Sequence, residues 1–461
     1  MGRLGRIAVC CGVFLFAVMG GGRGVAYAQT GERSDSAVVD FLRREHHIVF
    51  TDNNSVVPLE SGQEKFDDLF KAVRDARESI HLEYFNFRND SISTELFTLL
   101  ARKAREGVEV RALFDGFGNK SNNRPLRARH LRLLREHGVE IYEFDPFRFP
   151  YLNHALSRDH RKIVVIDGMV AYIGGMNVAD YYIKGKKELG AWHDFHMRVE
   201  GDVVGQLQSI FLHIWNMTTH QHVRGPQYYP GCADPRKRFA DLKPDTTATA
   251  GRKLVGVVNR EPHITPTVVR ETFLAAINAA RHHIQIINPY FTLNRKLRKA
   301  LRRAVERGVD VEVMVSEKSD IPITPRIVEY NANKLMRWGA KVYVFQGGFH
   351  HTKVMAVDGE LAYVGSANLN SRSLSWDYEC NLLVADTCFT QQIEGLFEQQ
   401  KSACYQLTPE RRRQMPPRQR LAGWLFHFLQ PFVRHEPSSI PRSGAVVPTW
   451  FVSTLFSEDH A

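Results

Sequence analysis

One nine-residue pattern occurs twice in this chain. Residues 160–168 read HRKIVVIDG and residues 351–359 read HTKVMAVDG, so histidine, lysine and aspartate recur at the same spacing 191 positions apart. A single match to so short a pattern carries little weight, because chance alone can produce it. Two matches with the same spacing predict that one domain is present twice and that the doubled motif carries its chemistry.

The order of predicted helices and strands repeats as well. Apolar residues recur at helical spacing in some segments and form short apolar runs in others. Helix, strand, helix and strand are predicted over 66–77, 79–87, 94–107 and 108–115, and again over 269–281, 283–291, 295–308 and 309–316. This alternation predicts an α/β fold with parallel strands, built as two tandem domains.

Each copy of the motif lies on a predicted strand that enters a hairpin. An apolar run, an Asp-Gly pair and a second apolar run follow each histidine, which is a strong hairpin signal. Alternate side chains share one face of a strand, so the histidine and the lysine of each copy point the same way. An asparagine follows each histidine after 17 residues, on the return strand. Each repeat thus places three polar side chains near one sheet edge: His160, Lys162 and Asn177 in the first, and His351, Lys353 and Asn368 in the second.

The aspartates Asp167 and Asp358 complete the two motifs, and we count them with the candidate catalytic residues for that reason. Formation of the Asp-Gly turn explains most of their presence, however. They also lie too far along the strand to share a site with the histidine and lysine easily.

The doubled motif suits chemistry at a phosphate group. Two lysines and two asparagines supply positive charge and hydrogen-bond donors without the carboxylate cluster that Mg²⁺ or Ca²⁺ would need. One neutral imidazole can attack phosphorus while the other, protonated, gives its proton to the leaving alkoxide. A histidine pair can also bind a metal, but each lysine would place a cation beside the ligand. The six cysteines are scattered without a CxxC pair, so neither a zinc site nor a disulfide framework is predicted. We expect no metal and no cofactor.

The doubled HxKxxxxD pattern with its downstream G-[GS]-x-N resembles the phospholipase D superfamily. The segments IHLEYFNF, DHRKIVVIDGMVAYIGGMNVADYY and HTKVMAVDGELAYVGSANLNSRS are together similar to the bacterial cardiolipin synthase branch of that superfamily. The resemblance extends from about residue 40 to about residue 405. It implies two phospholipase D-like α/β domains that pack as a pseudo-twofold pair around one shared active site.

The resemblance also assigns roles to single residues. It implies that His160 is the nucleophile and His351 the acid, and that a carboxylate behind each histidine orients its ring. Asp194 and Glu379 fit the positions of these two orienting carboxylates. Ser366, beside Asn368, offers a further hydroxyl donor for the phosphate, whereas Gly175 occupies the equivalent place in the first half. The family usually has arginine where this chain has His193, which leaves the role of that position open.

The predicted organisation has five parts. They are a signal peptide or N-terminal membrane anchor over 1–28, domain 1 over 35–224, a linker over 225–253, domain 2 over 254–405 and a basic and apolar tail over 406–461. The first part has a positive start, a 14-residue apolar run and AYA before Gln29, the order of an export signal. Cardiolipin synthases of this branch typically begin with two membrane-spanning helices, which this sequence does not show. The tail either lies in the headgroup layer of an anionic membrane or packs as a helix on the α/β body.

The formal net charge of +11 favours an anionic partner. The predicted reaction is phosphatidyl transfer between two phosphatidylglycerol molecules, at the membrane of a bacterial cell envelope, on the inner membrane or its periplasmic face. A secreted or periplasmic location is the alternative. A phospholipid hydrolase would use the same intermediate, a nuclease of the superfamily is a further alternative, and a lipid- or nucleic-acid-binding protein without activity is disfavoured by two intact motifs. We expect a membrane surface and no nucleic acid as partner, and the oligomeric state is left open.

Overall fold

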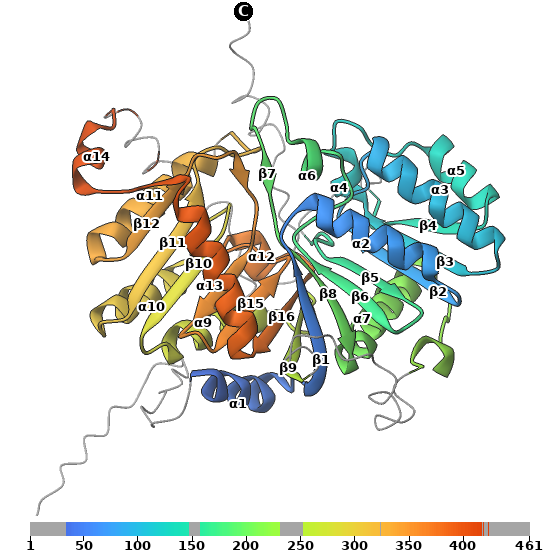
Figure 1. Cartoon of the computed structure of the whole chain (residues 1–461), viewed down its shortest axis with the longest axis horizontal. Coiled ribbons are helices and arrows are strands. Elements are labelled where there is room, and N and C mark those ends of the chain that lie inside the picture. Colours follow the sequence, from blue (N-terminus) through green and yellow to red (C-terminus); the bar gives the residue numbers. More distant parts are fainter. Residues whose placement is uncertain are drawn as a thin grey trace, which may run out of the picture. The chain divides into compact units, whose positions relative to one another are not determined.

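The structure is a computed structural model that describes residues 34–146, 157–230, 252–322, 324–416, 418 and 423 (Figure 1). The chain divides into two units, Met1–Glu32 and Arg33–Ala461, and every described residue belongs to the second. The predicted export or anchor segment over 1–28 lies outside the described residues, as do most of the predicted linker and most of the predicted tail.

The first half begins with a helix and a long strand and then alternates helices with strands. Its elements are α1 (Ser34–His46), β1 (Phe50–Leu59), α2 (Gly62–Asp75), β2 (Ser79–Tyr84), α3 (Ser91–Arg105), β3 (Glu109–Asp115), α4 (Gly116–Lys120), α5 (Ala128–Glu136), β4 (Val139–Phe144), β5 (Lys162–Ile166), β6 (Val170–Gly174), α6 (Tyr181–Lys184), β7 (Trp192–His193), β8 (His196–Gly201), α7 (Asp202–Thr219) and the 3-10 helix η1 (Pro226–Tyr228).

The second half repeats this order. Its elements are β9 (Lys253–Arg260), α9 (Val268–Ala279), β10 (His283–Ile287), α10 (Arg295–Glu306), β11 (Asp310–Ser316), α11 (Thr324–Trp338), β12 (Lys341–Phe345), β13 (Phe349–His350), β14 (Val354–Val357), β15 (Leu361–Gly365), α12 (Ser371–Ser375), β16 (Glu379–Ala385), α13 (Thr387–Lys401), β17 (Cys404–Gln406) and α14 (Pro409–Gln414).

Fifteen of the described strands form one sheet, in the order β17-β12-β11-β10-β14-β15-β16-β9-β1-β8-β6-β5-β2-β3-β4. β2, β3 and β4 are parallel in the first half, as are β10, β11 and β12 in the second. β1 and β9 pair in antiparallel fashion at the middle of the sheet and join the halves. The predicted α/β class, the parallel strands and the construction from two similar halves are therefore confirmed.

The two motif strands run antiparallel to the parallel strands beside them. β5 pairs with β2 so that Lys162 lies opposite Tyr84, and β14 pairs with β10 so that Val354 lies opposite Ile287. Tyr84 and Ile287 are the last residues of β2 and β10. Each histidine motif therefore begins at the carboxyl edge of its half, where loops after the parallel strands can meet it.

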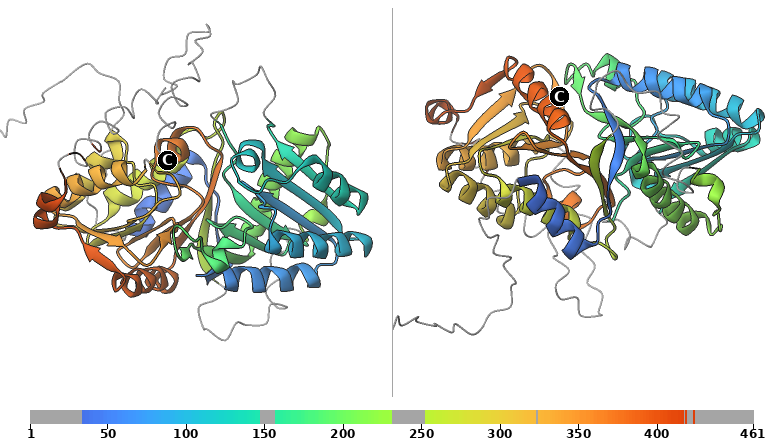
Figure 2. Two further views of the ribbon diagram at one scale, coloured as in Figure 1. Left: turned by 90° about the horizontal axis from the view of Figure 1, so that it is seen from above. Right: turned by 60° about the horizontal axis from the view of Figure 1, so that its bottom comes forward.

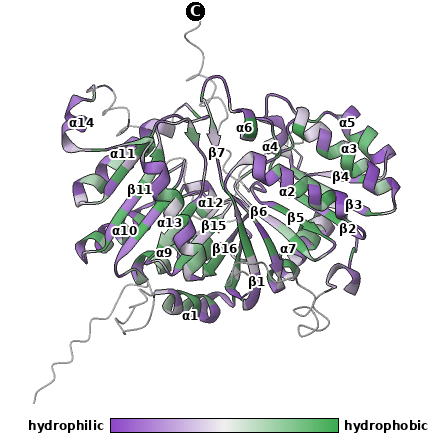
Figure 3. Cartoon of the chain, in the orientation of Figure 1, coloured by the Kyte–Doolittle hydropathy of each residue, from purple (hydrophilic) through white to green (hydrophobic). Residues whose placement is uncertain are grey.

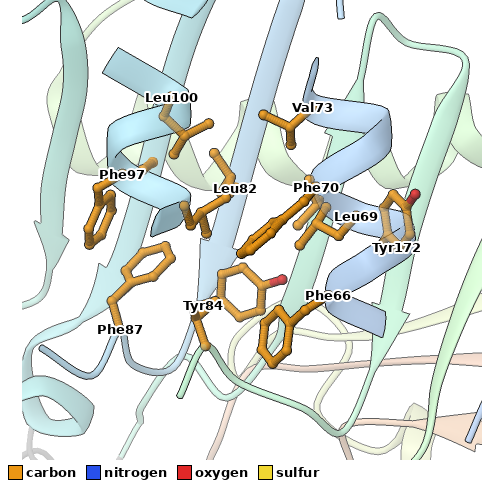
Figure 4. Close-up of a cluster of buried hydrophobic side chains, with 14 of the residues drawn as sticks. Phe66, Leu69, Phe70, Val73, Leu82, Tyr84, Phe87, Phe97, Leu100 and Tyr172 are labelled. Atoms are coloured by element: carbon orange, nitrogen blue, oxygen red, sulfur yellow. The ribbon is translucent and has the colours of Figure 1, made fainter. Parts of the chain in front are cut away.

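Two apolar clusters hold these layers together. In the first half, α2 and α3 cover β2 and pack Phe66, Leu69, Leu82, Phe97 and Leu100 against one another (Figure 4). A second cluster contains strand residues of both halves, including Ile163, Ile173, Val354, Val364 and Leu382. Full burial of such a side chain contributes roughly 1.5–3 kcal/mol, so this shared core fixes the two halves against each other.

Helix α1 differs from the predicted domain assignment. The prediction assigns residues 35–224 to domain 1, but α1 packs against α9 of the second half. His46 Nε2 lies 2.9 Å from Glu271 of α9, and the Ser34 hydroxyl donates to Asp358 at 2.7 Å. Helix α1 therefore packs on the second half, although it precedes the first half in the sequence.

The two motif aspartates accept hydrogen bonds from backbone N–H groups. This structural role corrects the prediction that counted them with the candidate catalytic residues. Asp167 accepts hydrogen bonds of 2.8 to 2.9 Å from three successive backbone N–H groups, at residues 77–79. Asp358 accepts three more, also of 2.8 to 2.9 Å, from residues 281–283. Both aspartates have positive φ, 53° and 54°, in the hairpin turns. Each carboxylate therefore fixes the start of a parallel strand, at the opposite end of the motif strand from the histidine.

Replacing Asp167 by alanine should destabilise the fold, because three strand-entry N–H groups lose a charged acceptor. We expect the free energy of unfolding to fall by about 2 kcal/mol, measured by urea denaturation. Asp75→Ala is the matched control, since that carboxylate forms only an exposed pair with Lys71 and should change stability by less than about 0.5 kcal/mol. Equal effects of the two substitutions would refute the structural role of Asp167.

Candidate active site

The residues just before each histidine form backbone contacts with the other half. β13 pairs with β7 in parallel, and an isolated parallel bridge joins Asp159 to Tyr378. The backbone N–H of His351 donates to the carbonyl of His193 at 2.6 Å, and that of His160 donates to the carbonyl of Tyr378 at 3.0 Å. His193 and Tyr378 directly precede the two candidate carboxylates. The same contact thus occurs twice, related by the pseudo-twofold arrangement of the halves.

These contacts give each histidine a carboxylate from the opposite half. His160 Nδ1 lies 3.1 Å from Glu379 Oε1, and His351 Nδ1 lies 2.6 Å from Asp194 Oδ2. Both carboxylate side chains are fully buried. A carboxylate at Nδ1 favours the tautomer with its proton on that nitrogen, which leaves Nε2 as the acceptor of each ring.

Both histidines are held mainly in the neutral form. Burial lowers the pKa of His160, and the positive charge of Lys162 lowers it further, while Glu379 acts in the opposite direction. Burial and Lys353 bring the pKa of His351 to about 4. A neutral imidazole with a free Nε2 is the form that can act as a nucleophile or a base.

The two lysines lie inside the same buried site. Burial lowers the pKa of Lys162 to about 7 and that of Lys353 to about 8. Lys353 itself contributes to the lowering at Lys162, so the two ammonium groups are near enough to repel each other. Each amine also donates to the backbone carbonyl of the histidine two residues before it. An anion placed between them would relieve the repulsion and favour the charged form of both.

The two carboxylates keep their negative charge in spite of burial. Burial acts to raise the pKa of Glu379, but His160 and Lys162 outweigh that effect and bring it to about 2. Burial acts to raise the pKa of Asp194 as well, but Lys353, His351 and the backbone N–H of Phe195 together outweigh it and lower that pKa. The site therefore consists of opposite charges that compensate one another within the protein interior.

The carboxylates differ in length, and so do their supports. The Ser366 hydroxyl donates to Glu379, so it orients the carboxylate and is not free to bind a phosphate as the sequence suggested. In the first half the equivalent residue is Gly175, and a Cβ there would lie 2.2 Å from an oxygen of Asp194. Asp194 instead accepts from the backbone N–H of Phe195 at 2.8 Å. Glycine at 175 thus makes room for the shorter carboxylate.

The two asparagines stand at the same edge as the lysines. Asn177 and Asn368 follow β6 and β15, the return strands that pair with β5 and β14. The backbone N–H of Asn177 donates to the Tyr182 hydroxyl at 2.9 Å. The side-chain oxygen of Asn368 is buried and has no hydrogen-bond partner among the described residues. Amide oxygen and nitrogen are assigned from their partners, so this end of Asn368 is equally available as a donor to phosphate oxygens.

Lys65 of α2 is a buried residue near the site that the sequence reading did not single out. Its amine lies 3.0 Å from the carbonyl of Asn177 and 3.4 Å from that of Met176. Burial lowers its pKa well below the usual value. Its burial could have been predicted from its position four residues before Leu69, on the apolar face of the helix.

Aromatic rings line both histidines. The ring centroid of Phe85 lies 5.1 Å from that of His160, and the rings of Trp192 and Tyr290 lie 5.4 Å and 5.7 Å from that of His351. These rings come from the loops and short strands at the carboxyl edge. They lower the polarity around the imidazoles and restrict the access of water.

His193, whose role the sequence leaves open, acts here through its backbone carbonyl. Its ring is half-buried and packs with its centroid 5.1 Å from that of Phe345. His193 contacts the nearest motif histidine, His351, through the main-chain hydrogen bond described above. The position therefore contributes to packing between the halves, and its side chain is not among those that surround the imidazoles.

The fold and the site together define a phospholipase D-like enzyme. A family model described as "Cardiolipin synthase, PLD-like domain" matches residues 69–215 and 273–401, one region in each half. The crystal structure of phosphatidylserine synthase from Haemophilus influenzae Rd KW20 has the same fold, with a TM-score of 0.63 at 15% identity over 87% of this chain and 98% of that one.

Cardiolipin synthases are similar to this chain over most of its length. The enzyme of Listeria monocytogenes serotype 4a is 33% identical over 365 residues, which cover 78% of this chain and 72% of that protein. The major cardiolipin synthase ClsA of Bacillus subtilis strain 168 is 32% identical over 380 residues, or 82% and 75% of the two chains. The chain therefore belongs to the cardiolipin synthase family of phospholipase D-like enzymes, and it is a phosphatidyltransferase.

Membrane attachment stays a prediction. Within the described ranges no helix is long and apolar enough to cross a bilayer. The same ranges contain no group of three or more His, Cys, Asp or Glu side chains that could hold a metal ion. The predicted N-terminal apolar run lies outside the described residues, and so does most of the predicted tail over 406–461.

The crossed pairing makes a prediction about proton binding. Glu379→Gln removes the negative charge beside His160, so the pKa of His160 should fall further while that of His351 changes little. Asp194→Asn should have the reverse effect. Side-chain NMR titration of the histidines measures both values. A shift at His351 caused by Glu379→Gln would contradict the pairing.

The glycine beside Asp194 provides a second prediction. Gly175→Ala should displace the carboxylate and with it His351, and we expect kcat to fall about a hundredfold. Gly395→Ala is the matched control, since a Cβ there meets nothing within 4 Å and activity should be unchanged. Thermal unfolding should show that Gly175→Ala is still folded at the assay temperature, so that its loss of kcat is not a loss of folded protein. Full activity of Gly175→Ala would remove the basis for this packing argument.

Proposed function

We propose that the protein is a cardiolipin synthase that transfers a phosphatidyl group from one phosphatidylglycerol molecule to another and releases glycerol. One observation carries the proposal: two imidazoles, each held by a carboxylate from the opposite half, share a buried site with two lysines. The similarity of the chain to cardiolipin synthases supports the choice of lipid.

In the first step, Nε2 of His160 attacks the phosphorus atom of a bound phosphatidylglycerol. A phosphorus–nitrogen bond forms, the bond from phosphorus to the headgroup glycerol breaks, and His351 gives a proton to the leaving oxygen. We assign the nucleophile to His160 because its side chain is 16% exposed, against 7% for His351. The more accessible ring is the better placed to meet phosphorus.

His351 must carry a proton to act as the acid, and its pKa of about 4 describes the site without substrate. The bound phosphodiester brings a negative charge next to the ring, which favours the imidazolium form. Asp194 keeps its charge and, through its contact with Nδ1, stabilises the imidazolium that forms when Nε2 is protonated. Substrate binding thus supports protonation of His351.

In the second step, a hydroxyl group of a second phosphatidylglycerol attacks the phosphatidyl-histidine. His351, now neutral, takes the proton of that hydroxyl, and the phosphorus–nitrogen bond breaks to give cardiolipin and free His160. The charges and amides of Lys162, Lys353, Asn177 and Asn368 hold the non-bridging oxygens in both steps, where electrostatic stabilisation is usually the largest contribution. The scheme uses no metal and no cofactor.

The substrate places the reaction at the membrane of a bacterial envelope. Anionic phospholipid is the expected partner, and nucleic acid is not. Water would resolve the same intermediate into phosphatidic acid, the hydrolase alternative. The rings of Phe85, Trp192 and Tyr290 around the imidazoles favour a lipid acceptor, because they reduce the access of water.

Mass spectrometry of products tests the proposal directly. Purified protein with phosphatidylglycerol vesicles and EDTA should form cardiolipin and glycerol. Phosphatidic acid as the main product would identify a hydrolase, and a dependence on one added divalent ion would refute the metal-free scheme.

Histidine variants in the same assay separate the two roles. Both His160→Asn and His351→Asn should lower turnover by at least about a thousandfold. Only His351→Asn should accumulate a phosphorus–nitrogen adduct, detected on the intact protein. An adduct on His351 in the His160→Asn protein would reverse the assignment.

A further inference from the structure

Most of the net positive charge lies on three neighbouring helices of the second half. α10, α11 and α14 contain twelve Lys and Arg and three Glu, a net charge of +9, while the whole chain has +11. α10 contacts α11, which in turn contacts α14, so these charges share one surface (Figures 1 and 2). We call this surface the basic face.

Eight of the twelve cations of the basic face are exposed to solvent. Each of its three glutamates pairs with an arginine of its own helix, which leaves a large excess of positive charge. Figure 3 shows α10 and α14 as largely hydrophilic. The exposed cations are Arg295, Lys296, Lys299, Arg302, Arg303, Arg337, Arg411 and Arg413.

The internal duplication shows that the fold does not require this charge. α3 is the counterpart of α10, because each lies between the first two parallel strands of its half. The two helices end alike: the N–H of Gly107 donates to residue 104 at 3.1 Å, and that of Gly308 to residue 305 at 2.9 Å. This register places Leu96 and Leu100 of α3 at the positions of Leu297 and Leu301 of α10, and all four are buried. The two helices therefore pack their inner faces in the same way.

Their outer faces differ. In this register, the exposed residues Glu95, Thr98 and Arg102 of α3 correspond to Lys296, Lys299 and Arg303 of α10. We call these three positions of each helix its stripe. The net charge of the stripe is zero in α3 and +3 in α10. Since the same helix position accepts a neutral stripe, packing does not explain the cations of α10.

We infer that the basic face binds the surface of an anionic phospholipid bilayer. The inference rests on the proposed function only for the choice of lipid over other polyanions. α10 and α11 begin just after β10 and β11, at the carboxyl edge where His351 lies. Ile321, in the loop that leads into α11, is 45% exposed at that edge and is suited to enter the headgroup layer. Cations near such a surface attract anionic headgroups strongly at low salt.

Exchanging the two stripes tests the inference. Lys296→Glu with Lys299→Thr gives α10 the residues of α3, and co-sedimentation measures binding to vesicles of equal phosphatidylglycerol and phosphatidylcholine. We expect affinity to fall at least about tenfold. Lys296→Gln with Lys299→Gln, which keeps good helix formers, should weaken binding in the same direction. Full binding by both variants would overturn the inference.

A further variant distinguishes the position of the positive charges from the net charge of the protein. Adding Glu95→Lys and Thr98→Lys to the first variant restores the net charge of +11 but puts the cations on α3. Binding should stay weak. Recovery of full binding would mean that only net charge matters, and tighter binding of the natural protein to duplex DNA than to vesicles would assign the face to nucleic acid; either result overturns the inference.

Vesicle binding is measured without turnover, so it stays readable if the proposed reaction fails. Where the reaction is observed, turnover of a short-chain, soluble phosphatidylglycerol should be the same in all these variants. A loss of that turnover in the α10 variants would place the stripe in the chemistry and contradict a role in docking.

Discussion

The site depends on one backbone contact that occurs twice: the N–H of each motif histidine donates to a carbonyl of the other half. That carbonyl belongs to the residue just before a buried carboxylate. The main chain therefore decides which carboxylate meets which imidazole, before any side chain is considered. Because Glu379 and Asp194 carry charge where solvent cannot stabilise it, the arrangement holds only while both halves supply their opposite charges.

The two halves position their carboxylates with different residues. Glutamate with Ser366 and aspartate with Gly175 both bring a carboxylate to Nδ1 of a histidine, one through a hydroxyl support and the other through the removal of a side chain. Neither residue of such a pair can change alone without loss of space or of a hydrogen bond. The pseudo-twofold symmetry is thus a symmetry of function, while the packing beneath it has diverged.

Much of this could be predicted from the sequence. The doubled spacing of His160 and His351, the Asp-Gly turns and the repeated order of elements describe local structure, which short segments encode. The crossing of the carboxylates could not be predicted, because the distance from histidine to carboxylate along the chain does not tell which half a strand end will face. The support role of Ser366 and the contact of Lys65 with the Asn177 carbonyl could not be predicted either, because both depend on which elements pack side by side.

The crossed carboxylates also bear on what a single half could do. A separate half would hold a histidine and a carboxylate that never meet, so it could complete a site only by pairing with another copy or with its complement. In a covalently joined chain that encounter is intramolecular, and its effective concentration is set by the fold. Assembly of the site thus becomes independent of how dilute the protein is.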